Sequence, residues 1–241
     1  MNPEQCVILV PVAAHIEPAT LDCLSRLMDR GYRVQTLRGC SQIDLARSML
    51  ATDALRDGFA ETLWIDSDVT FTVEDVERLR AHGKPFTAGL YVKKGNPEFA
   101  CKFREGTREL TFGTDGGLIE LEYAAMGFTH IRREVYERIQ SGLGLPTCSG
   151  GYDGKTIVPY FLPLLAPIPG GFDYLSEDYS FCYRARQVAC PVFADTRLKL
   201  GHGNGPYRYT WDDIAPRQTF AGGSIEIEQK QRPVPSVVTS V

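Results

Sequence analysis

The feature that most constrains the fold is a regular alternation of strand-like and helix-like segments in the first part of the chain. Residues 6–12 (CVILVPV) form a continuous, β-branched apolar run, as expected of a strand covered on both faces. Apolar residues at helical spacing follow over 18–30 and again over 41–56, each closed by a glycine, Gly31 and Gly58. This alternation predicts an α/β fold with a mainly parallel central sheet and helices on both of its faces.

The pattern changes near residue 95, and shorter strands with a small antiparallel addition are expected beyond it. Thr72 is expected to cap one further helix, with Asp75 three residues on. Residues 141–159 are glycine-rich and predict a loop, and the tail beyond about residue 217 is expected to be irregular. The other expected strands are 32–37, 62–65, 84–92, 99–103, 109–112, 118–123 and 192–195, and the other expected helices are 133–140 and 177–186.

Composition excludes several classes of protein. The 241 residues carry a formal net charge of -4, which argues against a general nucleic-acid-binding surface, because phosphate binding needs a basic one. No apolar stretch approaches the roughly 20 residues that span a bilayer, and the N-terminus lacks the basic region of a signal peptide. The 7 cysteines include no C-x-x-C pair, so neither a zinc knuckle nor a redox dithiol is indicated, and a reducing cytoplasm is the expected location.

The acidic triplet Asp66-Ser67-Asp68 directly follows the apolar run TLWI. In an open α/β sheet, ligands bind outside the carboxyl ends of the strands, and Asp66 and Asp68 fall at such an end. Two carboxylates spaced i, i+2 suit a hard divalent cation, Mg2+ or Mn2+, whose coordination is completed by phosphates and water. The alternative, which stays open, is a loop whose aspartates only cap the next helix.

A second acidic site is Ser176-Glu177-Asp178, ahead of the expected helix over 177–186. Acidic residues in the first turn favour the helix dipole, and that structural role accounts for one of the two carboxylates. The flanking apolar residues indicate a partly buried helix start. A carboxylate held there can remove a proton from an acceptor hydroxyl as a general base.

Two further side chains are candidates, each with a purely structural alternative. His202 lies between glycines in LGHGN, where an imidazole can supply another metal ligand or can be an ordinary surface residue. Arg47 lies on the expected helix over 41–56 and can grip a phosphate or base, or simply pair with Asp44 three residues earlier. Lys93 and Lys94 can neutralise a diphosphate or form a solvated pair.

Taken in order, these segments resemble the GT-A glycosyltransferases, in particular the glycosyltransferase 2-like group. The resemblance extends from about residue 7 to about residue 204 and rests on the order and separation of several individually weak motifs. They are VILVPV, IDLARSML, LWIDSDV, AGLYVKK, AMGFTHIRREVYERI, SEDYSFCYRARQ and LGHGN.

The resemblance implies a single domain over residues 1–241. A nucleotide-binding half would occupy about 1–95 and an acceptor and catalytic half about 96–215, followed by the irregular tail 216–241. The implied activity is the metal-dependent transfer of a sugar from a nucleotide-diphosphate donor, with UDP as a first guess. The acceptor is an unknown hydroxyl on a glycan, a lipid-linked molecule or a protein.

On the donor side, the resemblance implies that Pro11 and Ala13 lie beside the nucleobase and that Arg47 assists nucleotide binding. Met126 and Gly127 would lie under the transferred sugar, where a glycine lets the backbone approach closely.

The resemblance also implies the metal and catalytic residues. Asp66 would contact the ribose or a metal-bound water, while Asp68 and His202 would ligate Mn2+ or Mg2+. Asp178 would be the base of an inverting reaction, with Glu177 its neighbour or substitute.

Two other functions remain compatible with the sequence. A sugar-1-phosphate nucleotidyltransferase uses a similar sheet, but its Gly-rich basic signature after the first strand is replaced here by PVAAHIEPAT. A catalytically inert module of the same fold would bind a nucleotide or glycan without transferring it.

Overall fold

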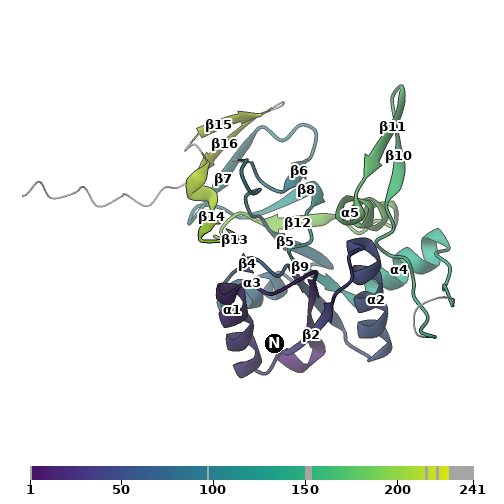
Figure 1. Ribbon diagram of the computed structural model, residues 1–241. Coiled ribbons are helices and arrows are strands. Elements are labelled where there is room, and N and C mark those ends of the chain that lie inside the picture. Colours follow the sequence, from purple (N-terminus) through teal and green to yellow (C-terminus); the bar gives the residue numbers. More distant parts are fainter. Residues whose placement is uncertain (1, 97, 150–153, 215–216, 221–222, 228–241) are drawn as a thin grey trace, which may run out of the picture.

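The computed structural model describes residues 2–96, 98–149, 154–214, 217–220 and 223–227. Its centre is an eight-stranded sheet in the order β2-β1-β3-β9-β5-β12-β8-β6 (Figure 1). The strand pairings make six strands run in one direction, with β9 and β8 opposite to them. The strands are β1 Cys6–Val12, β2 Arg33–Arg38, β3 Glu61–Ile65, β5 Phe86–Gly89, β6 Cys101–Phe103, β8 Leu118–Ala124, β9 Phe128–Arg132 and β12 Val192–Asp195.

Helices cover both faces of this sheet, as the alternation predicts. The helices are α1 Pro18–Asp29, α2 Ile43–Arg56, α3 Val73–Ala81, α4 Arg133–Leu143 and α5 Glu177–Gln187. Along β1, Val7 and Leu9 pack in the cluster that contains residues of α2, α4 and α5, whereas Ile8 and Val10 pack with residues of α1 and α3. Every residue of β1 is therefore buried, which is why its sequence is continuously apolar.

The sequence also predicts the start of α3 correctly. Thr72 accepts a hydrogen bond from the backbone N–H of Asp75, whose carboxylate accepts from the backbone N–H of Thr72, so that a complete capping box is formed.

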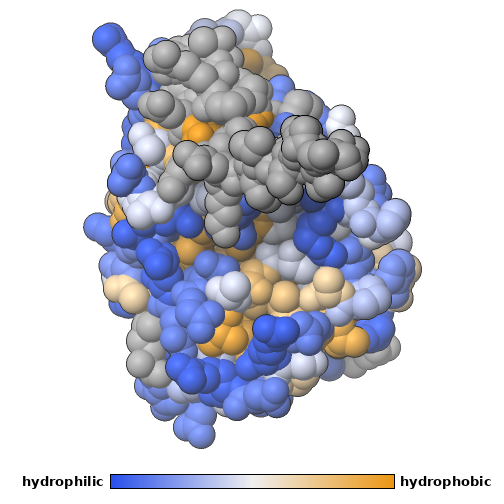
Figure 2. All heavy atoms as spheres, turned by 90° about the vertical axis from the view of Figure 1, so that its left-hand side faces the viewer, coloured by the Kyte–Doolittle hydropathy of each residue, from blue (hydrophilic) through white to orange (hydrophobic). Residues whose placement is uncertain are grey.

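Figure 2 shows the face on the left of Figure 1, which is mainly hydrophilic with hydrophobic residues grouped across its middle. Within the described residues, no helix is long and apolar enough to cross a bilayer.

Smaller sheets surround the central one. They are the hairpin β10 Leu164–Ile168 with β11 Gly171–Leu175, the sheet of β4 Val69–Thr70, β13 Gly201–Asn204 and β14 Tyr207–Tyr209, and the sheet of β7 Glu109–Phe112, β15 Arg217–Phe220 and β16 Gly223–Ile227. Two single-turn 3-10 helices, Pro3–Gln5 and Trp211–Asp213, complete the described elements. The hairpin projects from the body beside α5 (Figure 1).

Two local expectations are corrected, and one strand of the central sheet was not expected. The expected irregular tail over 216–241 contains β15 and β16, because β16 finds backbone partners by pairing in parallel with β7; residues 228–241 lie outside the described residues. The expected loop over 141–159 begins inside α4, which ends at Leu143 with Gly144 in the left-handed conformation (φ 64°), and residues 150–153 of it are not described. Strand β9 was not predicted at all, yet it separates β3 from β5.

Candidate active site

The site is organised by the turn Asp66-Ser67-Asp68, which leaves the carboxyl end of β3. Its backbone is tied to three different elements. The N–H of Asp66 donates to the carbonyl of Gly127 (3.0 Å), and the carbonyl of Ser67 accepts from Glu17 (2.8 Å). The carbonyl of Asp68 accepts from the N–H of Gly203 (2.7 Å). The turn is therefore held rigidly between the start of β9, the start of α1 and β13, which suits side chains that must present charge in a fixed geometry.

The two carboxylates of the turn have different partners. Asp66 Oδ1 accepts from the Nη2 of Arg47 at 2.8 Å, and Arg47 Nε lies 3.8 Å from a carboxylate oxygen of Glu177. The sequence-predicted residues Arg47, Asp66 and Glu177 thus come together from α2, from the end of β3 and from the first turn of α5. We call these three residues the Arg47 cluster.

Arg47 is buried, and its guanidinium lies 5.6 Å from the ring centre of Trp64. Burial opposes its charge, but Asp66 and Glu177 outweigh that effect and raise the pKa of Arg47. Its Nε and Nη1 have no hydrogen-bond partner among the described residues. Burial and the neighbouring Asp178 raise the pKa of Glu177, against the opposing effect of Arg47.

Asp68 faces the other way, towards β5 and β13. One of its oxygens contacts the Nζ of Lys94, and the other lies 3.6 Å from His202 Nε2. His202 Nδ1 lies 2.8 Å from the carbonyl of Val92. A carbonyl can only accept a hydrogen bond, so the ring proton lies on Nδ1. In a neutral imidazole, Nε2 is then the unprotonated nitrogen, and it is the ring atom near the Asp68 carboxylate. Two acceptors only 3.6 Å apart can bind one cation between them.

Gly127 and Tyr91 pack together beside Asp66 and His202. The hydroxyl of Tyr91 accepts from the N–H of Gly127 (3.1 Å), and its ring packs edge-on against His202 with centroids 4.9 Å apart. A Cβ on residue 127 would lie 2.4 Å from that hydroxyl and 2.7 Å from Asp66 Oδ2, so only glycine fits. Burial, and then the neighbouring carboxylates Asp66 and Asp178, raise the pKa of Tyr91 well above its usual value. Met126 is fully buried beneath this segment.

Asp178 lies beside Glu177 in the first turn of α5. Its Oδ1 accepts from the hydroxyl of Ser176 (2.5 Å) and from the N–H of Tyr179 (2.8 Å). No described residue donates a hydrogen bond to its Oδ2. The carboxylate is therefore fixed through one oxygen and can accept a proton with the other.

The remaining predicted residues, Pro11 and Ala13, lie at the carboxyl end of β1, which neighbours β3. Pro11 is buried in the strand, and Ala13 is exposed just beyond it. Among the described residues, no three His, Cys, Asp or Glu side chains form a group that could hold a metal ion, so Asp66, Asp68 and His202 do not come together as a set of three.

Tyr91 was not among the sequence-predicted residues, and for Lys94 the sequence left open both a role in neutralising a diphosphate and a solvated lysine pair. Both follow β5, in the segment AGLYVKK, directly at the carboxyl end of that strand. This position, the same that singled out Asp66, was the available signal.

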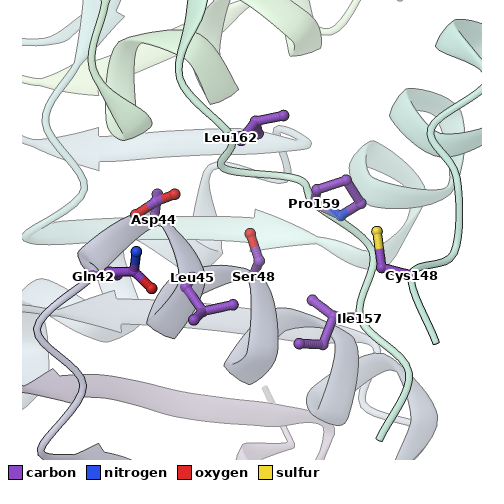
Figure 3. Close-up of a pocket in the computed structure, with 8 residues that line it drawn as sticks. All are labelled: Gln42, Asp44, Leu45, Ser48, Cys148, Ile157, Pro159 and Leu162. Atoms are coloured by element: carbon purple, nitrogen blue, oxygen red, sulfur yellow. The ribbon is translucent and has the colours of Figure 1, made fainter. Parts of the chain in front are cut away.

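A separate cavity of about 220 Å³ lies on another side of α2 (Figure 3). Side chains of the first turns of α2 face the segment that leads to β10. The lining residues are Gln42, Asp44, Leu45, Ser48, Cys148, Ile157, Pro159 and Leu162. The cavity contains none of the candidate catalytic or metal-binding residues.

No protein-family model and no curated protein matches this sequence. Among solved structures, A197 from STIV matches at 14% identity over 95% of this chain and 97% of its own, with a TM-score of 0.56. This likeness establishes a shared fold, and the fold is the expected α/β class.

Two matched structures are glycosyltransferases by name. One, involved in glycosylation of the major capsid of PBCV-1, matches at 12% identity over 55% of this chain and 62% of its own (TM-score 0.30). The other, GalNAc-T7 with UDP, GalNAc and Mn2+, matches at 14% identity over 98% of this chain and 46% of its own (TM-score 0.45). At these scores neither likeness decides the activity, which has to be argued from the site.

Proposed function

We propose that this protein is a glycosyltransferase of the GT-A type that transfers a sugar from a nucleotide-diphosphate donor to a hydroxyl acceptor. The observation that carries the proposal is the pairing of Asp68 with His202. The carbonyl of Val92 holds the imidazole through Nδ1, and the other ring nitrogen, Nε2, lies 3.6 Å from the Asp68 carboxylate. A donor set of carboxylate oxygen and imidazole nitrogen fits Mn2+ better than Mg2+, which prefers oxygen ligands alone.

The protein residues would hold the cation through Asp68 and His202, with Asp66 nearby on the same tethered turn. When bound, a divalent cation would offset the negative charge that develops on the departing nucleoside diphosphate. Arg47 has two buried nitrogens without partners in the described part of the chain, and it would direct positive charge at the donor or hold Asp66 in place for the ribose. Pro11 and Ala13, at the end of the adjacent strand β1, would contact the base, with UDP as the first candidate nucleotide.

The transfer step is assigned to Asp178. Its Oδ2 takes the proton of the acceptor hydroxyl while that oxygen bonds to the anomeric carbon. The bond from the anomeric carbon to the diphosphate oxygen breaks, and its electron pair leaves with the nucleoside diphosphate. Attack from the face opposite the leaving group inverts the anomeric centre. Glu177, whose carboxylate is turned to Arg47, would position the arginine and is the substitute base.

The experiment is a donor screen with Mn2+, read by release of nucleoside diphosphate from a panel of UDP-, GDP-, ADP- and CDP-sugars. We expect release from one donor class, and Asp178→Asn should lower it by at least 100-fold. Asp22→Asn, which removes an exposed carboxylate on α1, is the matched control and should leave release unchanged. Metal-dependent nucleotide binding without release from any donor or acceptor mixture would instead favour an inert binding module.

A further inference from the structure

Lys94 lies beside Asp68, one of the two residues proposed to hold the cation. Its Nζ contacts one oxygen of Asp68, while His202 Nε2 faces the other oxygen of the same carboxylate. The adjacent Lys93 points elsewhere and pairs with Glu98 at 3.2 Å. The two neighbouring lysines therefore have distinct surroundings, and only Lys94 lies at the position where a divalent cation would bind.

The contact has a consequence for cation binding. A carboxylate that already contacts an ammonium group is a weaker ligand for a divalent cation, because the two positive charges repel each other. A lysine ammonium is a compact charge on a flexible four-carbon stem, so it can leave Asp68 without moving the backbone. Its side chain is 36% exposed, which leaves it room to move.

We propose that Lys94 is an exchangeable counter-cation, an inference that rests on the proposed function. In the free protein it neutralises Asp68. When a divalent cation binds Asp68 and His202, the Lys94 side chain moves away from Asp68. Its ammonium then pairs with the diphosphate of the incoming donor. Lys94 thus disfavours the cation alone and favours the cation and donor together, which couples the two binding events.

Binding measurements on Lys94→Met test this exchange. Mn2+ alone is titrated by the electron paramagnetic resonance signal of the free ion, and nucleoside diphosphates (UDP, GDP, ADP and CDP) are then titrated by calorimetry at saturating Mn2+. Lys94→Met should bind Mn2+ about fivefold more tightly and nucleoside diphosphate about fivefold more weakly, as expected for a partly exposed ion pair worth roughly 1 kcal/mol. Lys94→Arg should stay within about twofold of the native protein for Mn2+, because it keeps the charge.

Lys93→Met is the matched control, and it should leave both affinities within about twofold. Unchanged Mn2+ affinity in a folded Lys94→Met variant would overturn the exchange while leaving the metal site standing. Absence of Mn2+ binding to the native protein would overturn the metal site and the exchange together. If Lys94→Met binds Mn2+ more tightly and nucleoside diphosphate more weakly, but the native protein transfers sugar to no acceptor, the exchange is supported. Only the transferase activity is then contradicted.

Discussion

Each end of strand β3 has a buried arginine paired with a carboxylate, but the two arginines differ in how many of their nitrogens are hydrogen-bonded. Glu61, the first residue of β3, accepts from Arg80 at 2.7 and 3.2 Å and pairs with the buried His130 at 2.7 Å. Asp66, directly after the last residue of β3, accepts from Arg47 at 2.8 Å. We call Glu61, Arg80 and His130 the Arg80 cluster, for comparison with the Arg47 cluster at the opposite end of the strand.

The difference between them is how completely the arginine is bonded. All three nitrogens of the Arg80 guanidinium donate hydrogen bonds, because Tyr32 and the carbonyl of Asn2 accept those that Glu61 does not. Arg47 is equally buried, but two of its nitrogens have no partner among the described residues. A satisfied buried network stabilises one conformation, whereas an unsatisfied one costs free energy that a further hydrogen-bond acceptor can offset.

The pKa values follow the same division. Burial alone would raise the pKa of Glu61, but the hydrogen bonds from His130 and Arg80 outweigh it and hold that pKa at about 2. Burial and Asp178 raise the pKa of Glu177 despite the nearby Arg47. Both ends are perturbed, but in opposite senses: the amino end holds Glu61 in its charged, paired form, whereas at the carboxyl end the pKa of Glu177 is shifted towards the neutral form, as in many functional sites.

The largest expected effect on stability is that of removing Arg80. Arg80→Met leaves the Glu61 carboxylate without its main partner in a partly buried position and should lower the free energy of unfolding by about 3–5 kcal/mol. Chemical denaturation at pH 7 measures it. Arg78→Met, on the exposed face of the same helix α3, is the matched control and should change stability by less than about 0.5 kcal/mol. Equal effects of the two substitutions would contradict the assignment of the Arg80 cluster to stability.

Acid should selectively weaken the same cluster. Glu61 has a folded pKa of about 2 against 4.5 for a free side chain, so its contribution of about 3 kcal/mol is complete above pH 4.5 and is lost as the pH falls towards 2. Burial lowers the pKa of His130 below 6.5, which adds a loss of stability below that pH. Denaturation at pH 7, 5 and 3.5 should show stability falling with pH, and Glu61→Gln should flatten the lower part of this dependence. A profile unaltered by Glu61→Gln would count against this account.

The sequence predicts the layers of this fold better than it predicts either cluster. The apolar periods of β1, α1 and α2, and the capping box at Thr72, depend on local physics that can be read from neighbouring residues. Strand β9 is short, and it pairs with both β3 and β5. These partners are distant in sequence, so no pattern among neighbouring residues predicts the strand.

The same distinction holds for the site. The position of Asp66 and Asp68 after an apolar strand was readable from the sequence. That Asp66 faces Arg47 while Asp68 faces Lys94 was not, because those contacts join residues 19 and 26 positions apart. Their different partners are set by how α2 and the end of β5 pack around the turn.

Gly127→Ala should damage the carboxyl end of β3 sterically. Its Cβ would lie 2.4 Å from the Tyr91 hydroxyl and 2.7 Å from Asp66 Oδ2, so one of them must move. We expect a loss of about 2 kcal/mol in stability and at least tenfold weaker binding of nucleoside diphosphate with Mn2+. Gly89→Ala, crowded instead by Leu200 and Phe128 in the core, should lose similar stability. Loss of binding as large in Gly89→Ala would show that Gly127 acts only through general packing.

The smallest expected effect on stability, and the most informative one, is that of Arg47→Met. Among the described residues, two of the buried nitrogens of Arg47 have no partner, so this cost is already present in the native protein. Its hydrogen-bonded carboxylate, Asp66, is 27% exposed and can be solvated by water, and Glu177 lies 3.8 Å away without a hydrogen bond to it. Unfolding should therefore change by less than about 1.5 kcal/mol, well below the effect of Arg80→Met. Binding of nucleoside diphosphate with Mn2+ should nevertheless weaken at least tenfold, because the guanidinium is the buried charge at this end of the sheet. Arg56→Met, an exposed arginine on the same helix, should change neither quantity. If Arg47→Met were as destabilising as Arg80→Met and left binding intact, both arginines would be structural, and the two ends of β3 would not differ in the way their hydrogen bonds indicate.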